Sequence, residues 1–166
     1  MAYTVFRSDL MSGENVFADM VSIRVVDGNG DPVAVENGTI VELDKLEEGQ
    51  REVWTATVAT NSSDLVNCAV VATPEGWYDR KRNLDAFINP AGAIARGYRL
   101  RSNNLFSVTK EGFVSATAPT TAGAGVGIGT GGKINAAGTG LGTFEHTETQ
   151  GRYTYYTIKI GVVDET

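Results

Sequence analysis

A histidine flanked by two glutamates is the first group of side chains in this sequence that could perform chemistry. His146 lies beside Glu145 and two residues before Glu148, a combination that could carry acid–base catalysis or bind a metal ion. It is the only histidine of the chain, and the polar residues around it predict a turn, where a lone histidine most often faces solvent. No serine lies in a GxSxG motif. An enzyme built on these three residues is therefore our third hypothesis, and no catalytic residue is assigned.

Three acidic and amide side chains have the spacing that opens a calcium-binding EF-hand loop. Asp27, Asn29 and Asp31 occupy its first, third and fifth positions, but Pro32 replaces the required glycine and Gly38 replaces the final glutamate. Asp, Asn and Gly in this order are typical of a turn between two strands. We expect a turn here and no bound metal.

A glycine pattern and a single cysteine are the last groups considered as candidates for phosphate binding and thiol chemistry. The string 127–132 fits GxGxxG, but no predicted strand precedes it, no helix follows it, and Lys133 is not followed by serine or threonine. Cys68 lies in an apolar run, where burial raises the pKa of a thiol and lowers its reactivity. The sequence therefore predicts no cofactor.

Composition limits the classes of protein and partner. The chain has 166 residues, 42% of them hydrophobic and 20% charged, which suits one globular domain. Its net charge of -6 disfavours nucleic acid as a partner, because phosphate binding requires a basic surface. No apolar stretch has the length of a membrane-spanning helix, and the first residues lack a signal-peptide pattern. We expect synthesis in the cytoplasm, no membrane, no nucleic acid and no small-molecule substrate.

Short runs of branched and aromatic residues, separated by Gly, Asn and Asp, predict strands in the first half. In the third of these, Trp54, Ala56 and Val58 alternate with polar residues and should face the core. The run 68–72 is apolar throughout, which favours a strand buried on both faces. The predicted strands are 21–26, 33–35, 39–43, 51–59 and 68–72.

The middle of the chain changes to a helical pattern. Leu84, Phe87 and Ile88 are spaced three and four apart, which predicts one short helix within 79–88 that ends before Pro90. A second short helical turn is expected over 91–96, ended by Gly97.

Strand patterns return after residue 97. We expect strands at 98–101, 105–109 and 113–116, and a strong alternation predicts a final strand over 153–160. Between them, residues 123–142 hold 9 of the 20 glycines and predict a long Gly-rich loop. The fold class is therefore mainly β (α+β): a compact antiparallel sheet or barrel-like domain over 18–166 with one short helix.

An extended N-terminal arm is expected over 1–17. Tyr3, Val5 and Phe6 form a short apolar segment, and Ser12 and Gly13 then favour a hinge. These three residues are candidates for contact with a partner surface. The alternative is that 3–6 form the first strand of the domain's own sheet.

Charge is distributed unevenly along the chain. The segment 79–101 holds six basic and two acidic residues, whereas 36–52 holds six acidic and two basic residues. Either segment could be a solvated face, or the two could meet between copies of the chain. The inter-subunit candidates are Arg80, Arg82, Arg99, Arg101, Glu42, Glu47 and Glu48.

The chain as a whole resembles the capsid decoration, or head-stabilising, proteins of tailed bacteriophages that infect Gram-positive bacteria. The resemblance rests on the opening MAYTVFRSDLMSG, on NGTIVEL, ATPEGWYDRKRNLDAFINPAG and ARGYRLRSNNLFSVTKEGF, and on the closing GRYTYYTIKI. It implies a non-enzymatic, mostly β virion protein that binds the major capsid protein on the capsid exterior, as a homotrimer. The Gly-rich segment has no place in this pattern. A virion surface module, such as a head fibre or host-adhesion domain that binds through this segment, is the alternative.

Overall fold

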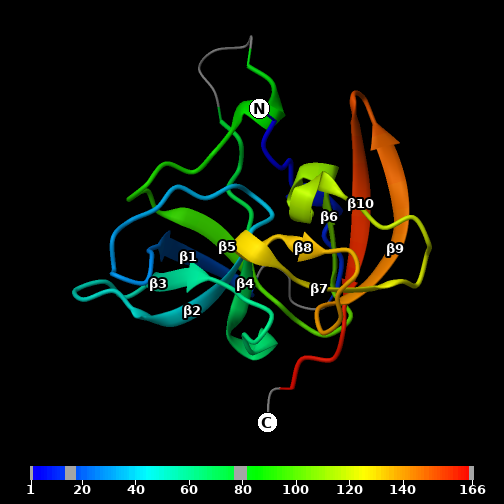
Figure 1. Cartoon of the computed structure of the whole chain (residues 1–166). Coiled ribbons are helices and arrows are strands. Elements are labelled where there is room, and N and C mark those ends of the chain that lie inside the picture. The colour runs from blue at the N-terminus through cyan, green and yellow to red at the C-terminus, as the bar shows by residue number, and fades with distance from the viewer. Residues whose placement is uncertain (1, 14–17, 77–81, 165–166) are drawn as a thin grey trace.

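Two β-sheets packed against each other form the chain in a computed structural model, which describes residues 2–13, 18–76 and 82–164 (Figure 1). The strands of the first sheet are β1 (Met20–Val25), β2 (Ile40–Leu46), β3 (Val53–Val58), β4 (Cys68–Val71) and β5 (Ala95–Arg99). Those of the second are β6 (Leu105–Val108), β7 (Gly125–Ile128), β8 (Ile134–Asn135), β9 (Gly142–Gln150) and β10 (Tyr153–Ile160). The mainly β fold class is therefore confirmed.

The first sheet closes on itself as a five-stranded barrel in the order β1-β3-β2-β4-β5. Neighbouring strands are antiparallel except β1 and β3, which run parallel with Ile23 opposite Trp54. The closing pair is β1 with β5, where Ile23 lies opposite Ala95. Of the β3 residues expected in the core, Ala56 is fully buried, whereas Trp54 and Val58 are half-buried at the edge of the barrel interior.

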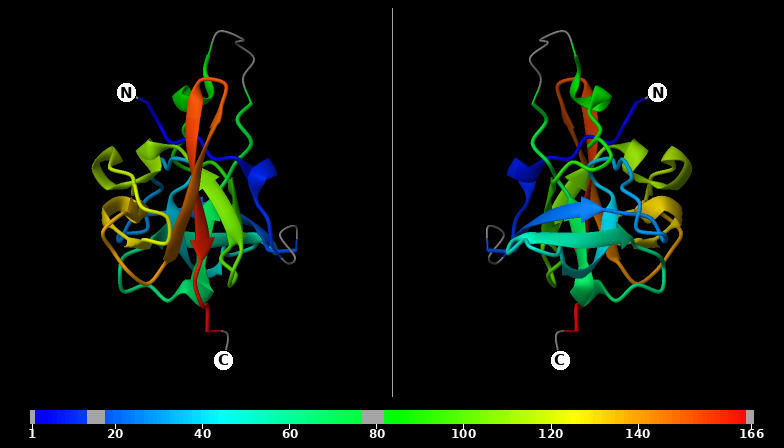
Figure 2. Two further views of the ribbon diagram at one scale, coloured as in Figure 1. Left: turned by 90° about the vertical axis from the view of Figure 1, so that its right-hand side faces the viewer. Right: turned by 90° about the vertical axis from the view of Figure 1, so that its left-hand side faces the viewer.

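The second sheet has the order β6-β10-β9-β7-β8 and is dominated by the long antiparallel pair of β9 and β10. Their hairpin rises above the rest of the sheet in Figures 1 and 2. A two-residue turn joins them, with Gly151 at φ 61°, a conformation that glycine adopts without strain. One β-bulge shifts the register between Thr157 and Ile158.

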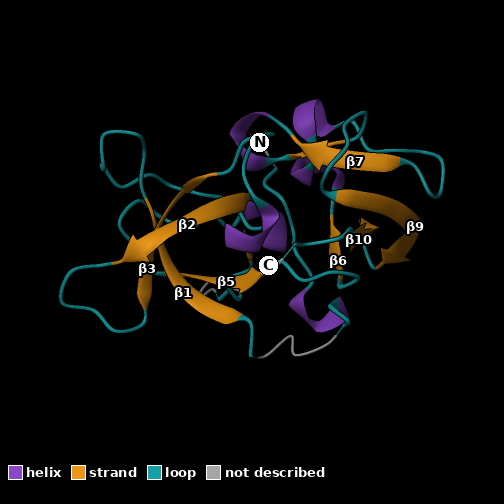
Figure 3. Cartoon of the chain, turned by 90° about the horizontal axis from the view of Figure 1, so that it is seen from below, coloured by secondary structure: helices purple, strands orange, loops and turns teal. Residues whose placement is uncertain are grey.

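Strand β4 forms the wall between two hydrophobic cores. Cys68 and Val70 face the core between the two sheets, whereas Ala69 and Val71 face the barrel interior. All four residues are buried, which confirms the expectation of a strand covered on both faces. β4 therefore contributes side chains to both cores, and Figure 3 shows the two sheets side by side.

The N-terminal segment is part of the core, which corrects the predicted arm. Val5 is 0% exposed and Phe6 is 3% exposed, and the Phe6 ring stacks on Phe106 of β6 with centroids 5.9 Å apart. The Thr109 amide donates to the Val5 carbonyl (3.1 Å). Residues 14–17 of the predicted arm lie outside the described residues. The apolar alternation that favoured an arm instead supplies an edge to the domain's own sheet.

Polar contacts fix the same segment. The Thr4 amide and hydroxyl both donate to Glu36 (3.0 Å each), and the Arg7 guanidinium donates to Gln150 (2.5 Å). Tyr3 is half-buried, and its amide donates to the Asp85 carbonyl (2.8 Å). Val5 and Phe6 are therefore unavailable to a partner surface in this fold, and Tyr3 is the only one of the three candidates with exposed area.

Every helix in the described part of the chain is a three-residue 3₁₀ turn, and none is long enough to cross a membrane. They are η1 (Ser8–Leu10), η2 (Leu65–Asn67), η3 (Leu84–Ala86), η4 (Lys110–Gly112), η5 (Val114–Ala116) and η6 (Thr130–Gly132). The predicted helix at 79–88 is reduced to η3, and its residues 79–81 lie outside the described part. The expected strand at 113–116 is η5 instead. Of the expected turn at 91–96, residues 91–92 form a turn, whereas Ala95 and Arg96 belong to β5.

The Gly-rich segment is not a loop, which corrects another expectation. It contains β7, η6 and β8, and it places Val126, Ile128, Ile134 and Leu141 in the core between the sheets. Glycine is required by close backbone approach, because a Cβ on Gly142 would lie 1.9 Å from the Lys159 carbonyl oxygen. The entropy cost of ordering glycine is thus offset by tight sheet packing.

Candidate functional site

The histidine and glutamates singled out in the sequence all lie on β9, not in a turn. Glu145 accepts a hydrogen bond from the Thr143 hydroxyl (2.7 Å) and lies 3.4 Å from the Lys159 ammonium, and these contacts lower its pKa. His146 is exposed. Glu145 thus serves an ion pair of the sheet, whereas His146 and Glu148 lie along the strand beyond it.

The cysteine has a structural environment. Cys68 is fully buried, and its thiol donates to the Asp64 carbonyl (3.3 Å). Burial raises the pKa of the thiol to about 12, so the reactive thiolate is scarce at neutral pH.

The calcium-like motif forms a turn. The Asp27 carboxylate accepts from the amides of Asn29 (2.8 Å) and Asp31 (3.0 Å), so it closes the loop with its own backbone. Among the described residues, no group of three His, Cys, Asp or Glu side chains could hold a metal ion.

Most inter-subunit candidates are engaged within the chain. Arg101 forms an ion pair with the buried Asp19 (2.9 Å), and the Arg99 guanidinium lies 4.9 Å from the centroid of the Trp54 ring at one end of the barrel. These two arginines close the barrel end, and their use between copies would break existing contacts.

Two of the acidic inter-subunit candidates also have partners within the chain. Glu47 pairs with Arg24, and Glu42 accepts from the Ser63 hydroxyl (2.6 Å). Glu48 and Arg82 are exposed. Arg80 lies outside the described residues.

The end of β2 and the turn that joins it to β3 present charged residues of the acidic segment, and residues 44–52 are called the β2–β3 turn. Asp44, Glu48 and Glu52 are exposed there beside Lys45 and Arg51. Leu46, the last residue of β2, is 43% exposed, although it is apolar. An apolar side chain within a charged rim is the composition of a protein-contact surface.

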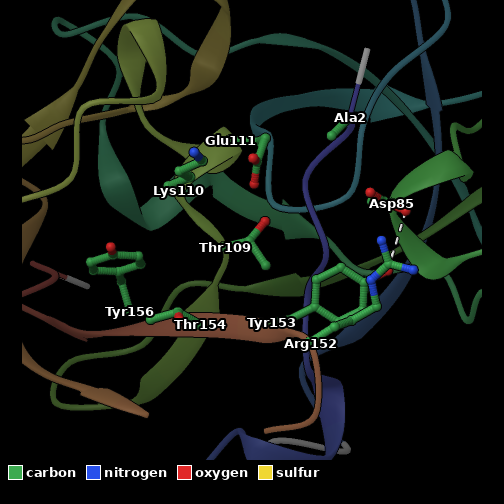
Figure 4. A pocket seen from close by; sticks show the side chains of 9 residues that line it. All are labelled: Ala2, Asp85, Thr109, Lys110, Glu111, Arg152, Tyr153, Thr154 and Tyr156. Carbon is green, nitrogen blue, oxygen red and sulfur yellow. Dashed lines mark hydrogen bonds between the residues drawn. The ribbon is translucent and has the colours of Figure 1, made fainter. Parts of the chain in front are cut away.

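A second candidate surface lies beside the turn of the β9–β10 hairpin. One hollow of about 350 Å³ lies between the start of β10 and η4 (Figure 4). Its Tyr153 hydroxyl donates to Asp85 (3.2 Å), and the Arg152 guanidinium lies 5.5 Å from the centroid of the Tyr153 ring. Its lining residues are Ala2, Asp85, Thr109, Lys110, Glu111, Arg152, Tyr153, Thr154 and Tyr156.

A groove of about 540 Å³ adjoins this hollow, since Lys110 and Tyr156 line both. One wall is β9 from Phe144 to Thr147, and the other is formed by residues of the segment 116–122. Ala116, which lines the groove, and Ser115 before it both have positive φ, which costs about 1–3 kcal/mol at each non-glycine position. This groove could not be predicted from the sequence, because the segments that form its walls are distant in the chain.

The Gly-rich segment borders a third hollow, of about 660 Å³, against the end of β3. Its rim carries neutral polar side chains: Thr60 and Asn61 from one side, and Thr130 and Asn135 from the other. Such a rim offers hydrogen bonds without net charge.

Comparisons with protein-family models, with curated proteins and with solved structures found no match for this chain.

Proposed function

We propose that this chain is a non-enzymatic virion structural protein that binds the outer surface of a tailed-phage capsid and stabilises it. The resemblance of the whole chain to decoration proteins supports this proposal. In that role the chain contacts the major capsid protein and assembles as a homotrimer on the head.

One observation carries the proposal. The β2–β3 turn and the β9–β10 hairpin lie at opposite sides of the molecule (Figure 1), so each copy offers two separate candidate surfaces for contact. A protein that stabilises a shell by bridging its neighbours requires at least two such surfaces. The buried N-terminal segment does not supply one, which leaves these two.

The β2–β3 turn is our candidate for contact with the capsid. Leu46 provides apolar area, and Glu48 is an exposed charge from the acidic segment. The cost of exposing Leu46 to water in the free chain is recovered when a partner covers it.

The test is co-sedimentation of the purified chain with undecorated heads. We expect the wild-type chain to sediment with the heads, and Leu46→Asp with Glu48→Lys to reduce its binding at least tenfold. Asn29→Lys, in an exposed turn of the barrel, is the matched control and should bind normally. Failure of the wild-type chain to sediment would contradict the proposal.

The hollow beside the Gly-rich segment supports a second candidate function. A virion surface module, as a head fibre or host-adhesion domain, would bind a neutral polar ligand such as a glycan there. Asn61→Ala with Thr130→Ala should then abolish binding to host cells while the chain still binds heads. Exposed side chains are the appropriate target, because deleting 123–142 would remove part of the core.

A further inference from the structure

The edge of β9 that faces away from β10 has no strand partner over most of the half of β9 nearest the hairpin turn. Toward this edge, β7 pairs only with Gly142 and Thr143, and the backbone of 123–124 bonds only to Phe144. From Glu145 to Thr149, β9 has no other strand beside it in the described part of the chain except β10. A run of free backbone donors and acceptors is a template for pairing with another strand.

The hairpin geometry fixes which residues offer those groups. Because only Gly151 and Arg152 form the turn, Gln150 and Tyr153 are a hydrogen-bonded pair, and such pairs alternate along the ladder. The amide and carbonyl groups of Thr147 and Thr149 therefore point away from β10, toward the free edge. The pairing of β10 with β6 is consistent with this pattern. Tyr156 lies opposite Thr147 on β9 and pairs with Val108 of β6 on its other edge.

We propose that this edge pairs with the same edge of a second copy, antiparallel, with a two-fold axis through Thr147. In this register His146 lies opposite the partner's Glu148, so an imidazole N–H meets a carboxylate on each side of the axis. The segment His146–Glu148 is thus complementary to its own reverse, and Glu145 is left out of the match because it is the extra residue of the β-bulge between the Thr157 and Ile158 pairs.

The nearest alternative register is unfavourable. An axis through Glu148 would place two carboxylates directly opposite each other, which is destabilising in a sheet. Within the chain, Glu148 accepts only from Gln150 (2.5 Å) among the described residues, so its second carboxylate oxygen is available. The His146 side chain is exposed, and it makes no hydrogen bond to another side chain in the described part of the chain, whereas its backbone pairs with Thr157. Both groups are therefore available for the contact.

The free edge limits this arrangement to residues 145–149. The hairpin rises above the rest of its sheet (Figure 2), but the backbone of 123–124 bonds to Phe144, and β7 pairs with Gly142 and Thr143. In this register the partner's Gln150 falls opposite Phe144, so the partner's turn must bend away from the edge, toward the groove of about 540 Å³ between β9 and the segment 116–122.

This inference does not depend on the capsid. It describes the free chain, and on a head the two-fold contact would join copies from different trimers. It is therefore tested with the purified chain alone, by sedimentation velocity at concentrations up to about 100 µM, where contacts of micromolar affinity are populated.

Thr147→Pro is the decisive variant. It removes the outward N–H while leaving the β9–β10 ladder intact, since proline is tolerated where the amide faces away from the sheet. We expect a dimer for the wild-type chain and at least a tenfold higher dissociation constant for Thr147→Pro. Thr147→Val keeps the amide and a β-branched side chain, and should dimerise as the wild type does. A wild-type chain that stays monomeric would overturn the proposal.

A charge exchange tests the register without proline. His146→Glu places two carboxylates opposite each other and should weaken the dimer at least tenfold. Adding Glu148→His restores opposite partners and should restore the dimer. A dimer that is insensitive to both His146→Glu and Thr147→Pro would show that another surface holds the copies together.

Discussion

The barrel interior and the core between the sheets are built from different side chains. The buried residues of the barrel interior are all aliphatic, with Trp54 half-buried at its edge, whereas the core between the sheets contains buried aromatic rings from both sheets and from the N-terminal segment. Five short strands enclose a narrow space that accepts only small and branched side chains. The contact between two sheet faces is broader and accepts rings. The aromatic members are Phe6, Tyr98, Phe106, Phe113 and Phe144.

The difference teaches where stability is concentrated. Burial of large aromatic side chains contributes more free energy than burial of alanine or valine. The contact between the sheets therefore dominates the stability of the fold, and the barrel interior mainly restricts side-chain size.

Deletion of residues 1–13 should give the largest effect. It removes Val5 and Phe6 from the core between the sheets and leaves β6 without its outer neighbour. We expect a loss of about 5 kcal/mol in the free energy of unfolding. In a chain of this size that lowers Tm by roughly 10–20 °C, measured by scanning calorimetry. Ser8→Ala, at an exposed position, is the control, and an unchanged Tm of the deletion would restore the arm hypothesis.

Gly142→Ala tests the glycine packing that supports the same core. The added Cβ would lie 1.9 Å from a backbone oxygen of β10, so the strand must move. We expect a loss of about 3 kcal/mol, measured by urea unfolding. At Gly125 a Cβ would lie 3.4 Å from its nearest neighbour, so Gly125→Ala should stay within about 0.5 kcal/mol of the wild type. Equal effects at both positions would contradict this account.

Ala56→Leu measures how narrow the barrel interior is. Ala56 is fully buried there, and a larger side chain should cost about 1–3 kcal/mol by overpacking. The neighbouring Thr57 lies on the other face of β3, so Thr57→Leu should change stability by less than about 0.5 kcal/mol. An Ala56→Leu chain as stable as the wild type would show that the interior has spare volume.

Cys68 should give the smallest effect, and only at alkaline pH. In the folded chain its pKa is raised from 9.0 to about 12 by burial, so above pH 9 the unfolded chain loses this proton first. Stability contributed by the protonated thiol is complete below pH 9 and falls by about 1.4 kcal/mol per pH unit until pH 12.

The measurement is the free energy of unfolding at pH 8 and pH 10 under reducing conditions. Cys68→Ala should lose less stability over this interval than the wild type by about 1.4 kcal/mol. Titration of lysine and tyrosine cancels in that difference. Equal losses in the two proteins would place the thiol in contact with solvent.

The strands with a strong local pattern could be predicted from the sequence. The apolar run of β4 indicated burial on both faces, and the alternation of β10 indicated the long terminal strand. The Asp27 turn followed from turn chemistry. In each case the signal lies within a few consecutive residues.

What could not be predicted depends on contacts between distant residues. The glycines near Gly142 have the composition of a flexible loop, and only the approach of β10 shows that they are packed. Residues 3–6 have the same apolar pattern in an arm and in an edge strand, and the contact with Phe106 decides between them. The free edge of β9 is invisible in the sequence, because it is defined by where β7 stops pairing.

The wall formed by β4 has a consequence for synthesis on the ribosome. The barrel strands are complete once about 100 residues have emerged, but Cys68 and Val70 stay uncovered until β10 follows. At roughly 5–20 residues per second, the nascent chain displays this apolar stripe for about 3–12 s. During that interval we expect the incomplete nascent chain to bind ribosome-associated chaperones. We also expect closely spaced ribosomes on one messenger RNA to favour aggregation of their nascent chains.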